Sequence, residues 1–227
     1  MKWRVAASRK ILRVGIASVL SSTLALAAQC ARAGVVDWAQ WSSNTSAAFA
    51  GLSLTYAGEL SGLFTSYPSW TPPATWADGT IVSNAPPSTG GMVKLLGGGL
   101  TGAVLDTITF SAPVVNPVMA IWSLGAGPTQ AEFAFTNATP TIVAGGISTE
   151  YGGSSIVLDG NAVFGNEGNG TVEFLGTFTS ISWTNPLLEN YYGFTVGVPA
   201  AVPEPSAIAL GAAGFALLLV IARRSRR

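Results

Sequence analysis

The chain has 227 residues, of which 48% are hydrophobic and 10% are charged, and its formal net charge is zero. This length suits one folded domain with processing segments, and the hydrophobic content excludes a wholly disordered protein. There is no histidine, and Cys30 is the only cysteine. A histidine general base, a Cys/His zinc site and a Ser-His-Asp triad are therefore excluded.

The first 33 residues have the three-part layout of a secretory signal peptide. Residues 1–13 carry five positive charges, residues 14–28 are apolar with small polar interruptions, and Ala31 and Ala33 frame a small-residue cleavage site. Cleavage after Ala33 would remove Cys30, whereas an earlier cut after Ala27 would keep it. We favour a signal peptide over the alternative interpretations, which are a buried helix or an uncleaved anchor. The sequence therefore predicts export.

The middle of the chain is acidic. Six of the eleven basic residues precede residue 34 and four follow residue 222, so that Lys94 is the only one between them. All eleven acidic residues lie within residues 34–205, which gives that stretch a net charge of 1 − 11 = −10. Phosphate binding needs clustered lysine and arginine, so a nucleic-acid partner is excluded.

Residues 34–200 have the pattern of an all-β ectodomain. Aromatic and β-branched residues alternate with polar ones in short runs, for example at residues 52–56, 106–110 and 180–184. Gly-Gly, Asn-Gly, Asp-Gly and Pro-Pro pairs separate these runs. About ten short strands with frequent turns predict a β-sandwich or jelly roll.

Two segments of this domain allow more specific predictions. Val118–Leu124 is apolar except for Ser123 and is predicted to be a core strand that runs into a turn at residues 125–128. Residues 37–49 form the one segment with a trace of helical spacing. There Trp38 and Trp41 are expected to pack on the core as one helical turn.

A proline-rich stretch at residues 66–78 carries three aromatic candidates for sugar binding, Tyr67, Trp70 and Trp76. Flat rings on a rigid loop can stack on sugar rings. The alternative, which we favour, is that these rings cap an open end of the sandwich.

Oxygen-bearing side chains suggest two further sites. Asp159, Asn161 and Glu167 lie in turn-like segments and are weak candidates for calcium, although the spacing does not match an EF-hand, and ordinary β-turns explain them as well. Glu167 and Glu173 could act as the carboxylate pair of an acidic glycosidase. Solubility alone explains both glutamates, and we expect no enzyme, no required cofactor and calcium only as an option.

The C-terminal end predicts a membrane span. Residues 207–222 carry no charge, and a helix of this length would be roughly 24 Å long, slightly short of a hydrocarbon core of about 30 Å. The four arginines that follow fit a cytoplasmic stop, and they are Arg223, Arg224, Arg226 and Arg227. Just before the span, Pro203, Glu204 and Pro205 favour a stiff, extended peptide at the membrane surface.

This tail resembles a PEP-CTERM sorting signal over residues 201–227, with its Pro-Glu-Pro motif, span and arginine cluster. The resemblance implies a Gram-negative bacterium that makes exopolysaccharide, and recognition by an exosortase, a membrane transpeptidase that would cut near residues 203–205. Residues 34–200 also look loosely like ectodomains fused to such tails, from which no activity carries over. The likeness rests on Trp38, Trp41, residues 165–170 and residues 192–197.

The sequence thus predicts an exported, non-enzymatic surface or extracellular-matrix protein. It would be anchored transiently in the inner membrane through residues 207–222 and then reach the cell surface or the exterior. A carbohydrate-binding module for extracellular polysaccharide is the alternative function, and an acidic glycosidase is a distant third.

Overall fold

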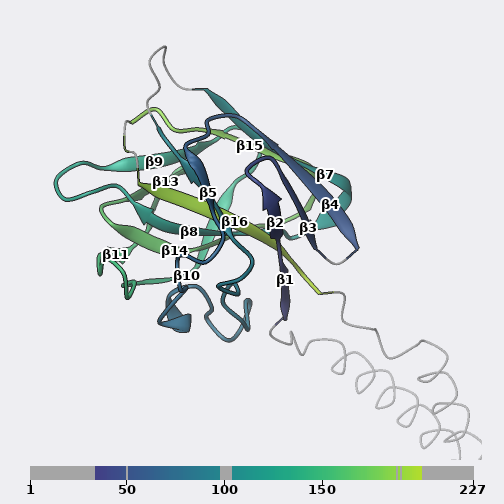
Figure 1. Ribbon diagram of the computed structural model, residues 1–227, viewed down its shortest axis with the longest axis horizontal. Coiled ribbons are helices and arrows are strands. Elements are labelled where there is room, and N and C mark those ends of the chain that lie inside the picture. Colours follow the sequence, from purple (N-terminus) through teal and green to yellow (C-terminus); the bar gives the residue numbers. More distant parts are fainter. Residues whose placement is uncertain (1–33, 50, 98–103, 188, 190, 201–227) are drawn as a thin grey trace, which may run out of the picture. The chain divides into compact units, whose positions relative to one another are not determined.

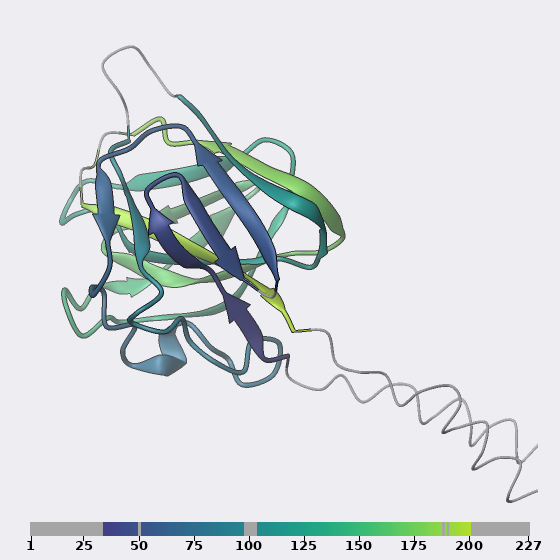
Figure 2. The same cartoon turned by 45° about the vertical axis from the view of Figure 1, so that its right-hand side comes forward.

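The computed structural model describes residues 34–49, 51–97, 104–187, 189 and 191–200 (Figures 1 and 2). The predicted signal peptide and the predicted sorting tail, with its span at residues 207–222, lie outside the described residues. Within the described ranges, no helix is long and apolar enough to cross a membrane.

The described residues form strands that lie in two sheets. In spatial order the first sheet consists of β10 (Pro140–Gly146), β14 (Gly168–Phe174), β8 (Val118–Leu124), β16 (Tyr192–Pro199), β6 (Met92–Leu95) and β5 (Gly62–Phe64), with β1 (Val36–Trp38) beside β16 and β11 (Ser154–Ser155) beside β14. The second sheet consists of β12 (Val157–Asp159), β13 (Ala162–Gly165), β9 (Ala131–Phe135), β15 (Thr177–Thr184), β7 (Leu105–Val115), β4 (Leu52–Ala57), β3 (Ser46–Phe49) and β2 (Gln40–Ser43).

The two sheets confirm the all-β prediction. Their strand pairs are antiparallel except for β11 beside β14. Among the described residues the one helical element is a 3-10 turn, Pro73–Thr75. The two sheets face one another as a β-sandwich, and the dark-blue strands β2, β3 and β4 of the second sheet cross in front of the yellow β16 in Figure 2.

Aromatic rings from both sheets fill the space between them. Phe194 of β16 lies edge-on to Trp183 of β15, with ring centroids 5.1 Å apart, and 5.4 Å from Tyr56 of β4. Phe174 and Phe135 make a second contact across the sandwich at 4.9 Å. Because each of these rings buries a large apolar area, they supply the main stabilisation of a domain whose described residues include no cysteine.

A second apolar layer covers the outer face of the first sheet. Along β8, Met119 and Ile121 face the core between the sheets, whereas Ala120 and Trp122 belong to a separate cluster on the other side. The connection at residues 65–90 covers that outer face. A strand that is buried on both faces needs no polar alternation, which explains the apolar run in β8. The predicted core strand and the predicted turn at residues 125–128 are both confirmed.

The two ends of the described domain lie together. Val36 pairs with Pro199, and the amide of Ala200 donates to the carbonyl of Val35 at 2.6 Å. The strand β16 then runs eight residues, roughly 26 Å at about 3.3 Å per residue, to the opposite end of the sandwich. At that far end, Gly193 pairs with Trp122 at the close of β8.

The helical turn expected for residues 37–49 is wrong. The segment forms β1, β2 and β3, and the chain passes at Ala39 from the first sheet to the second. Trp38 therefore joins the outer layer, and Trp41 points into the core, where its indole N–H donates to Thr195 Oγ1 at 3.0 Å. Both rings pack on apolar clusters, as expected, but they belong to different sheets. They lie three residues apart because the chain crosses between the sheets at Ala39, and not because the segment is helical.

Candidate functional site

The aromatic stretch at residues 66–78 supplies no exposed tryptophan ring. Trp70 and Trp76 are 1% and 0% exposed, lie edge to face at 5.2 Å, and pack in the outer layer. The indole N–H of Trp76 donates to the carbonyl of Ile121 at 3.1 Å. The favoured prediction, that these rings cap an open end of the sandwich, is therefore wrong in place, because both indoles cover a sheet face, and their burial leaves neither of them exposed for the alternative of stacking on sugar. Tyr67 is half-buried beside Trp122.

The three calcium candidates are not brought together. Asp159 pairs with Ala162 at one end of β13, whereas Glu167 follows the other end of that strand. Asn161 lies in the exposed turn beside Asp159. Within the described part of the chain, no group of three acidic, cysteine or histidine residues is arranged to hold a metal ion. The calcium prediction therefore has no support from these positions.

The two predicted glycosidase carboxylates are also apart. Glu173 lies in β14, which is buried on both faces, so the expectation that solubility explains this glutamate, as an exposed polar side chain, is wrong. Burial raises the pKa of Glu173, and the nearby Asp78 raises it further. Glu167 instead lies before β14, as expected from its Gly/Asn surroundings, and faces a pocket to which Glu173 does not contribute.

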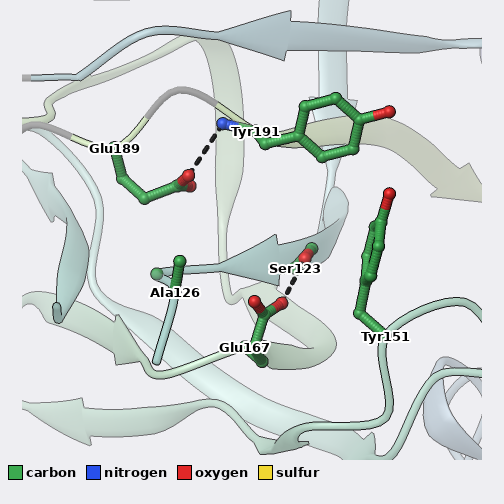
Figure 3. A pocket seen from close by; sticks show the side chains of 7 residues that line it. Ser123, Ala126, Tyr151, Glu167, Glu189 and Tyr191 are labelled. Carbon is green, nitrogen blue, oxygen red and sulfur yellow. Dashed lines mark hydrogen bonds between the residues drawn. The ribbon is translucent and has the colours of Figure 1, made fainter. Parts of the chain in front are cut away.

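That pocket, which we call the tyrosine pocket, lies at the end of the sandwich opposite to residues 36 and 199. It has a volume of about 200 Å3 and is lined by Ser123, Gly125, Ala126, Tyr151, Glu167, Glu189 and Tyr191. Figure 3 shows Glu167 and Glu189 approaching it from different sides, with the two tyrosine rings closing a third side. Its walls come from the end of β8 and from the segments that precede β11, β14 and β16.

Backbone strain is concentrated at one wall of the pocket. Ser123 and Glu167 have φ angles of 55° and 53°, in the left-handed region that residues other than glycine rarely adopt. The Ser123 hydroxyl donates to Glu167 Oε2 at 2.5 Å. The buried side chain of Asn169 holds both backbones, since its Oδ1 accepts from the Ser123 amide and its Nδ2 donates to the Glu167 carbonyl, each at 2.9 Å. The position of the Glu167 carboxylate is therefore fixed in advance.

The opposite wall consists of two partly exposed tyrosines on a buried base. Tyr151 and Tyr191 are 46% and 37% exposed, and their rings are 5.7 Å apart at 81° to one another. Trp122 lies against both rings, at 5.5 Å and 5.9 Å, and is fully buried. Hydrogen bonding with Tyr151 raises the pKa of Tyr191, and burial together with the same partner raises that of Tyr67. The hydroxyl groups of Tyr67 and Tyr191 therefore stay protonated at neutral pH.

The charge around the pocket is mostly negative. Glu189 is nearly buried, and its Oε1 accepts from the amide of Tyr191 at 2.8 Å, so the carboxylate is tied to the ring beside it. Lys94, the one basic residue in residues 34–200, lies with its Nζ 4.5 Å from the centre of the Tyr191 ring. The face of this tyrosine is thus already in contact with one ammonium group.

Two larger hollows have other linings. One, of about 540 Å3, includes Thr136, Asn161 and Phe178, and the other, of about 370 Å3, includes Asp37 and Trp38. Neither of them combines two carboxylates with exposed aromatic rings. The tyrosine pocket is therefore the strongest candidate site in the described part of the chain.

No family model, curated protein or solved structure matches this chain. The site is therefore judged on its own geometry.

Sequence reasoning found Glu167 but missed Ser123, Tyr151, Glu189 and Tyr191. One signal for Tyr191 was present: Tyr192, Phe194 and Val196 share one face of a strand, so the adjacent Tyr191 must point elsewhere. Tyr151 stands before Gly152-Gly153, where a ring has little local packing. The pairing of these two rings depends on segments 40 residues apart, which no local pattern reveals.

Proposed function

We propose that the folded domain binds a saccharide in the tyrosine pocket, and that the chain is an exported, non-enzymatic surface or extracellular-matrix protein. The observation that carries the proposal is the pair of exposed, nearly perpendicular rings of Tyr151 and Tyr191 beside two carboxylates. Sugars present an apolar C–H face that stacks on aromatic rings, and hydroxyl groups that donate to carboxylates. This is the carbohydrate-binding alternative, moved to a different set of rings.

The volume of the pocket supports recognition of a single sugar unit within a polymer. At about 200 Å3 it is smaller than the roughly 300–1,000 Å3 that drug-sized ligands occupy. The strained and hydrogen-bonded Glu167 and the tyrosines on Trp122 are held in place before binding, which lowers the entropy lost on association.

Export and anchoring rest on the two terminal segments of the sequence. The PEP-CTERM-like tail supports cleavage near Pro203 to Pro205 by an exosortase-type transpeptidase, after transient anchoring in the inner membrane. The fold is compatible with this route, because Val36 and Pro199 pair at one end of the sandwich and the tyrosine pocket lies at the other. A tethered domain would then present its pocket away from its attachment points.

Calorimetric titration tests the binding proposal. The full chain would be kept in a detergent without a sugar headgroup, because a maltoside could itself occupy the pocket. The titrants are β-1,4-linked tetrasaccharides of glucose, N-acetylglucosamine and glucosamine. We expect at least one to bind, Tyr191→Ala to weaken it roughly tenfold through loss of an aromatic contact worth about 1.4 kcal/mol, and the matched Tyr191→Phe to retain most of the affinity.

Two outcomes would overturn the proposal. Equal affinity of Tyr191→Ala and the unmodified protein for every bound sugar would place the binding elsewhere. Shortened oligosaccharides after incubation would replace binding by hydrolysis, with Glu167 and Glu189 as the carboxylate pair to be tested.

A further inference from the structure

We propose that the tyrosine pocket selects a sugar unit that carries an ammonium group, that is, an amino sugar rather than a neutral or acidic one. This inference rests on the proposed saccharide binding and specifies its ligand class. It follows from the charges, the rings and the existing cation contact around the pocket.

The first part of a cation site is a pair of carboxylates. Glu167 and Glu189 line the same pocket, and each accepts a hydrogen bond from the protein, Glu167 from the Ser123 hydroxyl and Glu189 from the Tyr191 amide. No basic side chain lines the pocket, and residues 34–200 as a whole carry one basic residue against ten acidic ones, a net charge of −9. A uronic acid or a sulfated sugar would therefore be repelled, whereas a cation would be attracted.

The rings provide the second part of a cation site. The negative face of an aromatic ring attracts an ammonium group within about 6 Å of its centre. Tyr151 and Tyr191 stand at 81°, so that a group in the angle between them can contact more than one ring surface. Figure 3 shows the two rings and the Glu167 carboxylate bordering one space.

The contact with Lys94 is an independent observation that this aromatic group accepts an ammonium ion. Its Nζ lies 4.5 Å from the centre of Tyr191 and 5.7 Å from that of Phe64. Lys94 belongs to β6 and is not a lining residue of the pocket. The domain thus already contains one ammonium–tyrosine contact beside the pocket. A ligand amine would make a second contact of this kind and would also bind the two carboxylates.

The test compares tetrasaccharides that share one backbone and differ at carbon 2 of each ring. Glucosamine, glucose and N-acetylglucosamine tetramers carry an ammonium, a hydroxyl and a neutral amide there, and a β-1,4-linked glucuronate tetramer adds the opposite charge. Titration of the full chain at one mildly acidic pH keeps the ligand amine protonated. We expect the glucosamine tetramer to bind roughly tenfold tighter than the glucose tetramer, and the glucuronate tetramer to bind least.

Three variants locate the effect. Glu167→Gln keeps an acceptor for Ser123 and should weaken binding of the glucosamine tetramer more than binding of the glucose tetramer, so that most of the preference for the amine is lost. Glu189→Gln keeps the contact with the Tyr191 amide and tests the second carboxylate in the same way. Glu132→Gln is the matched control, because it removes the same charge from β9, outside the pocket, and should keep the preference.

Equal binding of the glucosamine and glucose tetramers would overturn the inference and leave saccharide binding in place. The inference would also be overturned if Glu132→Gln reduced the amine preference as much as Glu167→Gln, since the preference would then come from net charge. Binding of none of the sugars would overturn the proposed function together with it.

Discussion

Replacing Asp106 by asparagine should remove a pH-dependent loss of stability. Asp106 lies at 0% exposure in β7, where its Oδ1 accepts from the Tyr56 hydroxyl at 2.5 Å and from the Glu59 amide at 2.7 Å. Burial raises the pKa of Asp106 from 3.8 to about 7, against the two hydrogen bonds, and the nearby Glu59 raises it further. The folded state therefore holds a proton that the unfolded chain releases above about pH 4.

The sign and size of the effect follow from proton linkage. Because the folded state binds more protons than the unfolded state between about pH 4 and pH 7, stability is greatest at the acidic end and falls as pH rises. A shift of about 3 pKa units corresponds to a loss of at most about 4 kcal/mol over that range. Asparagine resembles the protonated acid and can still accept both hydrogen bonds, but it does not titrate.

Urea unfolding of the full chain, followed by tryptophan fluorescence at a series of pH values, measures this effect. At each pH we compare the free energies of unfolding of Asp106→Asn and the unmodified protein. The variant should gain up to about 4 kcal/mol relative to the unmodified protein between pH 4 and pH 7. Asp159→Asn is the matched control, since its carboxylate is exposed in β12. Parallel pH profiles for Asp106→Asn and the unmodified protein would show that Asp106 does not bind a proton on folding.

Two further predictions concern the outer layer and the tail. Trp76→Ala should lower the free energy of unfolding by about 3–5 kcal/mol, because it empties a fully buried site and removes the hydrogen bond to the Ile121 carbonyl. Urea unfolding measures this loss, with Trp76→Phe as the control. A loss under about 1 kcal/mol, or one no larger than that of Trp76→Phe, would contradict the covering role of residues 65–90. Replacing Pro203 and Pro205 together by alanine should let the predicted helix extend toward residue 203 and leave uncut protein in the membrane fraction. Mass spectrometry of the secreted material tests this. A double variant that is secreted with the same C-terminal mass as the normal product would contradict it.

The strands were predictable where burial on one or both faces leaves a local pattern. Leu52, Leu54 and Tyr56 alternate with polar residues because β4 has one buried face, and Val118–Leu124 is apolar except for Ser123 because β8 has two. The segment with Trp38 and Trp41 was misread because it changes sheets after three residues of β1, too soon for a period of two to be established.

The outer layer and the pocket could not be predicted in the same way. Trp70 and Trp76 lie in a proline-rich connection whose composition is typical of an exposed loop, and their burial depends on the outer face of β8, about 45 residues away in the chain. The pocket joins Ser123, Tyr151, Glu167 and Tyr191 from four separate segments. The place of Glu167 among glycines and asparagines is a local signal, but it indicates a turn rather than a ligand, and the strand pattern at Tyr191 indicates only that its ring points away from the core.

The binding of an amino sugar between the two tyrosines can be tested by a crystal structure of the protein with the glucosamine tetramer. We expect one sugar ring against Tyr151 and Tyr191, with its amine within hydrogen-bonding distance of Glu167 or Glu189. A tetramer seated instead in the hollow that includes Thr136, Asn161 and Phe178, with the tyrosine pocket empty, would contradict it.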